Sequence, residues 1–223
     1  MRAAIYFTPP AGSPLAMTAN RWLGRNPFDG EATREPELIR DPLVASPARY
    51  GFHATIVAPF ALADAVDLAG IDARLSQFCA AQRPFAITAR VPERLGAFFA
   101  LVPDEQSAEL STMEEAAVRA FAPFRAPLSK EAIARRRPDR LTERQRAHLA
   151  EWGYPYVFED FRFHMTLSGA LTDEQAEALR PDLDETFAAF DGETLTIDQL
   201  AIFVEPEPGA PFRVHSVHRF EAL

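Results

Sequence analysis

The stretch FHATIVAPF, residues 52–60, has a near-copy in FHMTLSGAL, residues 163–171. Each copy places a His and a Thr two residues apart, with a Phe before the His and an aliphatic residue after the Thr. Alternate residues of a β-strand face opposite sides of the sheet. Each copy therefore predicts a strand with one apolar row, which suits a hydrophobic core, and one row that carries His and Thr.

The polar rows of the two predicted strands gather reactive groups. The first row holds His53 and Thr55, and the second holds Arg162, His164, Thr166 and Ser168. Buried polar groups need hydrogen-bond partners, so a hydrophobic core rarely accepts such a row. If the two rows face each other, they line a shared cleft that contains two imidazoles, several hydroxyls and a guanidinium.

This set of side chains suits a phosphate ester. His53 and His164 can divide the general-base and general-acid roles, because the pKa of an unperturbed His lies near neutrality. The hydroxyls of Thr55 and Thr166 can donate to non-bridging phosphate oxygens, and Arg162 can offset developing negative charge. We expect no metal and no other cofactor. The residues alone leave open which His is the base.

A structural role is the alternative for each of these residues. A single His on a strand is more often a structural residue than a catalyst, but a duplicated Phe-His-x-Thr pattern rarely arises by chance. The duplication favours catalysis for His53 and His164, and function for Thr55 and Thr166. For Arg162 and Ser168, both roles stay open.

Length and composition limit the classes of protein. The 223 residues suit one large domain or two small lobes, and the single cysteine, Cys79, indicates a reducing compartment. No apolar run approaches the roughly 18–20 residues of a membrane span, so we expect no membrane partner. We expect the protein to be cytoplasmic and monomeric. The net charge of −9 argues against long nucleic acids as partners, though not against a small phosphorylated substrate.

The order of predicted elements is typical of an α+β fold with antiparallel strands. We expect strands at 3–8, 50–60, 85–91, 95–102, 158–168, 194–205 and 212–220. We expect helices from Pro14, Asp64, Asp104, Ser129, Thr142 and Thr172, the last interrupted at Pro181. Residues 25–48 read as an irregular loop, and residues 123–153 as a connector between two lobes centred on residues 50–60 and 158–170.

The two motifs resemble those of the 2H phosphoesterase superfamily, which is named after a pair of HxT-type motifs. The matching residues are His53-Ala54-Thr55-Ile56 and His164-Met165-Thr166-Leu167. Tyr50-Gly51-Phe52 and Phe161-Arg162-Phe163, which precede them, further resemble a bacterial branch assigned to phosphonate metabolism. Val57 departs from that branch, in which we expect a polar or basic residue.

The resemblance implies a single bilobal LigT-like domain over residues 1–223. In it, two antiparallel sheets would face a central groove, with helices on the outer faces. It also implies metal-independent hydrolysis or formation of a cyclic phosphodiester of a small ribose-type metabolite or nucleotide. Two other functions remain: a non-catalytic binder of phosphorylated metabolites, and an RNA-end-processing 2′,3′-cyclic phosphodiesterase or ligase that would use the run Arg135-Arg136-Arg137.

A few further residues carry weaker predictions. Tyr6 and Thr8 lie on the first predicted strand, which could border the groove. His148 is predicted to be a solvated surface residue, and His215 to lie on a solvated sheet face. The histidines lack the spacing of a zinc site.

Overall fold

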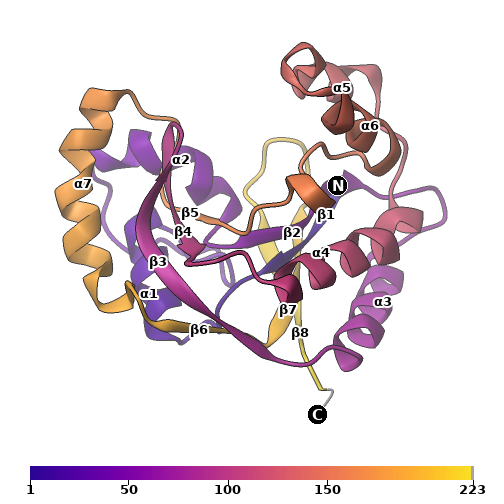
Figure 1. The fold of residues 1–223 in the computed structure, drawn as a ribbon, viewed down its shortest axis with the longest axis horizontal. Helices are drawn as coiled ribbons and strands as arrows, with labels where there is room; N and C mark the ends of the chain where they lie inside the picture. Colours follow the sequence, from indigo (N-terminus) through magenta and orange to yellow (C-terminus); the bar gives the residue numbers. More distant parts are fainter. Residues whose placement is uncertain (222–223) are drawn as a thin grey trace.

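One antiparallel sheet organises the protein. The computed structural model describes residues 1–221, and in these the strands run in the order β6-β3-β4-β5-β2-β1-β7-β8 (Figure 1). Their bounds are β1 Arg2–Phe7, β2 Ala54–Ala61, β3 Phe85–Leu95, β4 Phe98–Pro103, β5 Met165–Thr166, β6 Thr194–Ile197, β7 Gln199–Glu205 and β8 Arg213–Arg219. Every pairing is antiparallel. The predicted α+β class is confirmed.

The order of the strands divides the sheet into two halves of four. One half is β6-β3-β4-β5 and the other is β2-β1-β7-β8, and the short strand β5 joins them by pairing with both β4 and β2. The two expected sheets are thus halves of a single curled sheet. The two motif strands, β2 and β5, form the junction at its centre.

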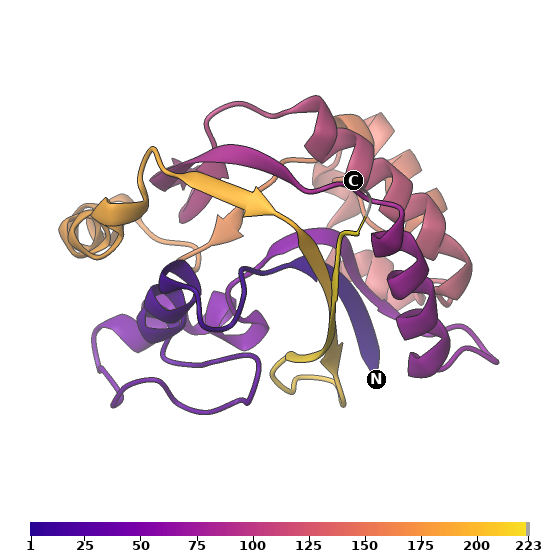
Figure 2. The ribbon, with the colours of Figure 1, turned by 90° about the horizontal axis from the view of Figure 1, so that it is seen from below.

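Helices lie on the outside of this sheet. Their bounds are α1 Pro14–Leu23, α2 Arg40–Tyr50, α3 Leu68–Ala80, α4 Ala108–Phe121, α5 Lys130–Arg135, α6 Glu143–Trp152 and α7 Asp173–Phe187. Helix α3 packs on β7 and β8, α4 on β2, and α7 on β3. Figures 1 and 2 show α3 and α4 together at one end of the molecule, with α1, α2 and α7 at the other.

Hydrogen-bonding caps set most helix starts. The predicted capping boxes of α6 and α7 are confirmed: the side chains of Thr142 and Thr172 each accept from the backbone N–H three residues on. Two predicted starts were a few residues early, because the capping side chains are those of Asp67 for α3 and Ser107 for α4. Each cap satisfies a backbone N–H that has no partner inside the helix.

Prolines explain why two further predictions, an interruption of α7 and a loop at residues 25–48, differ from the structure. The predicted interruption of α7 at Pro181 is wrong, because Pro181 lies on the exposed face, where water can satisfy the carbonyl that it leaves without a donor. The predicted loop at 25–48 contains the start of α2, which includes Pro42 and Pro47. Proline is tolerated in the first turn of a helix, so Pro42 does not prevent α2 from forming.

The second motif segment is less regular than predicted. A single long strand at 158–168 is wrong: residues Phe158–Asp160 form a 3-10 turn, and only β5 pairs as a strand. The turn begins at Phe158, whose φ of 55° is unusual for a residue with a side chain. The predicted strand at 194–205 is likewise divided at Asp198 into β6 and β7.

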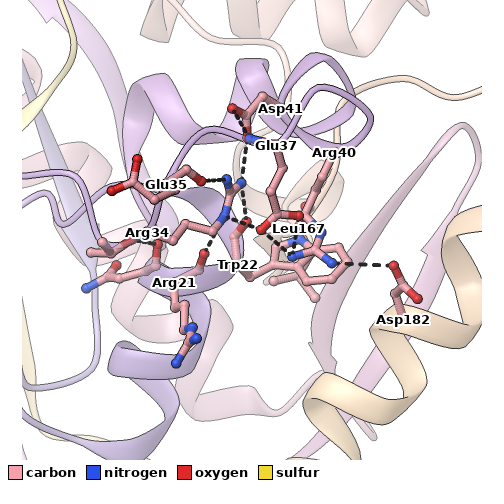
Figure 3. Close-up of polar contacts among 11 residues, drawn as sticks. Arg21, Trp22, Arg34, Glu35, Glu37, Arg40, Asp41, Leu167 and Asp182 are labelled. Atoms are coloured by element: carbon pink, nitrogen blue, oxygen red, sulfur yellow. Dashed lines mark hydrogen bonds and ion pairs between the residues drawn. The ribbon is translucent and has the colours of Figure 1, made fainter.

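A polar cluster fixes α1, α2 and α7 around the second motif. The indole Nε1 of Trp22 donates to the carbonyl of Leu167 over 2.8 Å, and the guanidinium of Arg40 lies 4.5 Å from the centre of the Trp22 ring (Figure 3). Arg40 also reaches Asp182 of α7, over 3.4 Å. The chain immediately after β5 is therefore held from the side of these helices.

No helix among residues 1–221 has the length and apolar character needed to cross a membrane.

Candidate active site

The antiparallel pairing of β2 with β5 relates the two motifs to each other. Ala54 lies directly opposite Met165 in this register. Extending the register by one residue in each direction places His53 opposite Thr166, and Thr55 opposite His164. The two histidines are then a diagonal pair, for which Cβ separations of about 7–8 Å are typical. A local twofold relation between the motifs follows, with its axis between Ala54 and Met165.

The predicted division of each motif into two rows is confirmed for the apolar residues and for the His and Thr side chains. The apolar row is buried, at 2% exposure or less for each of Phe52, Ala54, Ile56, Phe163, Met165 and Leu167. His53, Thr55, His164 and Thr166 are all partly exposed. The period of two along each strand therefore puts these four side chains on the open side of the sheet junction.

Each imidazole contacts the backbone carbonyl two residues before it in the chain. His53 Nδ1 lies 2.8 Å from the carbonyl oxygen of Gly51, and His164 Nδ1 lies 2.8 Å from that of Arg162. A carbonyl oxygen only accepts, so Nδ1 carries the proton in both rings. The neutral form of each His then presents the lone pair of Nε2, and His53 Nε2 lies 3.2 Å from the hydroxyl of Thr55.

Burial keeps both histidines neutral. Desolvation, together with a smaller contribution from the nearby His164, lowers the pKa of His53 to about 4, against the opposing effect of the Gly51 carbonyl. Desolvation also lowers the pKa of His164, again opposed by its carbonyl partner. A neutral imidazole with a free Nε2 is the form that a general base requires.

Aromatic rings hold His53 in place. The ring of Tyr6 stacks on His53, with centroids 3.7 Å apart and planes 21° apart, and the ring of Tyr50 lies 6.1 Å away. Tyr6 is buried, and its burial raises the pKa of its phenol well above the usual value. The prediction that Tyr6 borders the site therefore agrees with its position. Thr8 instead is buried and donates to the carbonyl of Phe52 over 2.9 Å.

Two cavities meet at the motifs. The larger, about 660 Å³, is lined by His164, Arg162 and Thr55 together with apolar and aromatic side chains, namely Leu95, Phe98, Val102, Tyr154, Tyr156 and Phe161. The smaller, about 220 Å³, is lined by His53, Thr55, Thr166, Arg2, Tyr6, Tyr50, Arg136 and Tyr154, among others. Thr55 and Tyr154 border both cavities. The four motif side chains thus lie where a small polar pocket meets a larger apolar one.

The structure gives different surroundings to Arg162 and Ser168, the two residues for which the sequence left both roles open. Arg162 is exposed, lines the larger cavity beside His164, and donates to the carbonyls of Glu159 and Phe161. Ser168, expected on the cleft row, is instead only 1% exposed. Its hydroxyl accepts from the N–H of Phe99 over 2.9 Å and donates to the carbonyl of Gly169 over 3.0 Å. These bonds give Ser168 a structural role in joining β4 to the second motif.

Sequence reasoning did not place Tyr50, Tyr154 or Gln106 at the site, and it connected Arg136 only with an RNA substrate, as part of the run Arg135-Arg136-Arg137. Tyr50, Tyr154 and Arg136 line the smaller cavity, and Tyr154 and Gln106 line the larger. Gln106 also accepts from the N–H of Phe163 over 3.3 Å. Tyr50 lies close to a motif in sequence, but the others come from the segment before α4 and from the connector, and only tertiary packing places them there.

The remaining histidines lie away from the motifs. The prediction that His148 is solvated is wrong: its side chain is 13% exposed and lies between Asp160 and Phe158. His215 is exposed as expected, while His218 contacts Asp72 over 2.9 Å. Among residues 1–221, no group of three or more His, Cys, Asp or Glu side chains is arranged to hold a metal ion.

The fold is shared with a solved structure over its whole length. TT0787 of Thermus thermophilus matches with a TM-score of 0.50 and 14% sequence identity, covering 100% of this chain and 99% of that one. Escherichia coli LigT, solved in complex with NADP+, matches with a TM-score of 0.45 and 11% identity, over 99% of this chain and 98% of that one. At these low identities the match to TT0787 shows a shared fold alone.

The chain belongs to the family described as "Protein of unknown function (DUF1045)", whose model matches residues 55–213. Two curated relatives carry the name ribose 1,5-bisphosphate phosphokinase PhnN. The one from Janthinobacterium sp. (strain Marseille) is 38% identical over 95% of this chain and 49% of its own length. The one from Laribacter hongkongensis (strain HLHK9) is 34% identical over 96% and 50%. The chain spans about half the length of these relatives.

Proposed function

We propose that this protein is a metal-independent 2H-type phosphoesterase that hydrolyses a cyclic phosphodiester of a small ribose-type metabolite. The observation that carries this proposal is the pairing of β2 with β5, which brings two His-x-Thr motifs together as diagonal neighbours. In both histidines Nε2 is unprotonated, because a backbone carbonyl holds the proton of each Nδ1. Two such groups on either side of one phosphorus atom can act as base and acid.

The reaction follows from this geometry. His53 Nε2 takes a proton from a water molecule, whose oxygen attacks phosphorus. The bond from phosphorus to one ring oxygen of the cyclic ester breaks. His164, whose protonated form is favoured by the negative charge of the bound phosphodiester, gives its proton to that oxygen. Thr55 and Thr166 donate to the non-bridging oxygens, and Arg162 offsets their charge. We assign His53 as the base because its pKa of about 4 keeps it neutral at pH 7, the form that can accept a proton.

The names of the relatives support a particular substrate. Those proteins are named as kinases of ribose 1,5-bisphosphate, and this chain matches only about half of each. A cyclic phosphate that joins O1 and O2 of ribose 5-phosphate gives ribose 1,5-bisphosphate when its bond to O2 is hydrolysed. We therefore propose this cyclic phosphate as the substrate, so that the reaction supplies the phosphorylated sugar that the relatives are named for. A role in phosphonate metabolism accords with the resemblance of the two motifs.

A turnover screen tests the proposal. The panel contains ribose 1,2-cyclic phosphate with and without a 5-phosphate, nucleoside 2′,3′-cyclic phosphates and 3′,5′-cyclic nucleotides, each with and without EDTA. We expect His53→Ala and His164→Ala each to lower kcat by about 10²–10⁴-fold. His215→Ala, at an exposed His away from the motifs, serves as the control. Turnover by the His53→Ala/His164→Ala double variant at the rate of the unmodified protein would rule the mechanism out.

The same screen separates the two alternatives. Binding of cyclic phosphates without turnover of any of them would favour a non-catalytic binder. Preference for RNA ends over the small cyclic phosphates, weakened by replacing Arg135 and Arg137, would favour RNA processing. Both of these arginines are exposed on the connector, where they could contact a large ligand.

A further inference from the structure

The connector places one arginine of the run Arg135-Arg136-Arg137 at the motif site. Helix α5 ends at Arg135, Arg136 is its C-cap residue, and Arg137 has a φ of 50°, which turns the chain into the next 3-10 turn. Arg135 and Arg137 are exposed, whereas Arg136 is partly buried and lines the smaller cavity with His53, Thr55 and Thr166. Figure 1 shows α5 and α6 together at the upper right of the molecule, above α4.

Tyr154 holds the side chain of Arg136. The guanidinium lies 4.9 Å from the centre of the Tyr154 ring, a typical cation–π distance. Tyr154 borders both cavities, so Arg136 is fixed to the wall between them. Its charge also acts on Tyr6, the residue that stacks on His53, since the electrostatic effect of Arg136 lowers the pKa of that phenol against the larger effect of burial.

Arg136 is the cation of this cavity that lacks an acidic partner. The cavity is also lined by Arg2, but Arg2 has an acidic partner, because Glu205 lies 2.5 Å from it and is shared with Arg49. Within residues 1–221, no carboxylate oxygen lies within 4.0 Å of the Arg136 guanidinium, and no Asp or Glu lines the cavity. In a chain of net charge −9, this leaves an uncompensated guanidinium beside the catalytic groups.

We propose that Arg136, held by Tyr154, binds a second, non-reacting phosphate of the substrate in the smaller cavity. The cavity is small and polar enough for a phosphate, and a guanidinium can bind two of its oxygens at once. This inference rests on the proposed function and adds to it the residue that selects a bisphosphorylated substrate over a monophosphorylated one.

Paired substrates test the assignment. Ribose 1,2-cyclic phosphate is compared with its 5-phosphorylated form, using the unmodified protein, Arg136→Ala, Arg136→Lys, Arg135→Ala and Arg137→Ala. We expect Arg136→Ala to lower kcat/KM for the 5-phosphorylated substrate by about 10- to 100-fold, the usual effect of losing a hydrogen-bonded charged partner, and to leave the other substrate nearly unchanged. Arg136→Lys, which keeps the charge, should recover part of the loss. The two neighbouring variants should have no such effect.

A binding measurement keeps this test separate from that of the catalytic proposal. Ribose 5-phosphate and ribose are titrated calorimetrically into the same five proteins, and no turnover is needed. Weaker binding of ribose 5-phosphate to Arg136→Ala alone would support the subsite even if no cyclic phosphate were hydrolysed. An equal loss of kcat/KM on both substrates, or binding of ribose 5-phosphate that is unchanged in Arg136→Ala, would overturn the assignment.

Discussion

The carbonyl of Leu43 in α2 accepts a hydrogen bond of 2.7 Å from the backbone N–H of Gly169, which follows the second motif. Inside a helix this carbonyl would accept from the N–H four residues later, but that residue is Pro47, which has no N–H. The proline therefore leaves Leu43 free to bind Gly169. Since α2 leads directly into the first motif, this hydrogen bond ties the backbones of the two motifs together.

Replacing Gly169 should weaken that tie. A Cβ atom at Gly169 would lie 3.2 Å from the Leu43 carbonyl oxygen, too close for an unshifted backbone. We expect Gly169→Ala to lower the free energy of unfolding by about 1–2 kcal/mol, as overpacking typically does, and to speed hydrogen exchange at residue 169. Gly12→Ala is the matched control, because a Cβ there meets nothing within 4 Å. Equal stability of the two variants in urea would contradict the prediction.

Gly51 should be required for the orientation of His53. Its φ of 80° and ψ of 171° suit glycine alone, and an added Cβ would lie 2.6 Å from Cβ of Pro27. The Gly51 carbonyl also holds Nδ1 of His53. We expect Gly51→Ala to destabilise the fold by about 1–3 kcal/mol and to lower kcat, because a shifted carbonyl no longer fixes the imidazole.

Gly96 provides the control for this substitution. Gly96 has a φ of 61°, but a Cβ added there would meet nothing within 4 Å. Gly96→Ala therefore introduces the strain of a positive φ without a clash like that between residue 51 and Pro27. Urea unfolding and steady-state kinetics of both variants distinguish the two contributions. If Gly96→Ala loses as much kcat as Gly51→Ala, the link from Gly51 to His53 is refuted.

The roles of the two histidines can be told apart by the leaving group. A p-nitrophenyl phosphodiester releases a phenolate that needs no proton, so loss of the general acid should matter little. We expect His164→Ala to retain most of its activity on such a substrate relative to the unmodified protein, while His53→Ala remains impaired by about 10²-fold or more. The reverse pattern would exchange the assignments.

The motif rows could be predicted because they depend on local geometry alone. A period of two along a strand decides which side His53 and Thr55 face, and a Thr followed three residues later by a Gln marks a helix start. Helix α2 was missed because its two prolines and its charges read as a loop, although Pro47 is tolerated there because Gly169 takes the place of the missing donor. The position of Arg136 and Tyr154 beside the motifs could not be predicted from the sequence, because it is set by packing between segments far apart in the chain.

Glu114 was also missed, although its position four residues after the buried Leu110 of α4 puts it on the inner face. Its side chain is 1% exposed, and Oε2 accepts from the N–H of Phe158 over 3.1 Å. Burial raises the pKa of this carboxyl to about 7, and the nearby Glu115 and Glu159 add to the rise. Phe158 starts the turn that leads to Arg162 and His164. The hydrogen bond from Phe158 to Glu114 therefore helps to fix the backbone before the second motif.

The raised pKa predicts the direction of a pH effect on stability. The ordinary pKa of a Glu side chain is about 4.5, and that of Glu114 in the folded protein is about 7. Between these two pH values Glu114 keeps its proton in the folded protein and loses it in the unfolded chain. The contribution of Glu114 to stability therefore falls as the pH rises through this window and is constant above it. Glu114→Gln stays neutral and can still accept from Phe158, so its stability relative to the unmodified protein should increase by on the order of 3 kcal/mol across the window.

Urea unfolding at pH 5 and pH 8 measures this change. The exposed Glu105, just before α4, gives the control variant Glu105→Gln, whose relative stability should not change with pH in this way. His148 and Arg119 lie against Phe158 and are present in every variant, so the difference between Glu114→Gln and the unmodified protein isolates the carboxyl. A relative stability of Glu114→Gln that is the same at both pH values would show that the pKa of Glu114 is not raised in the folded state.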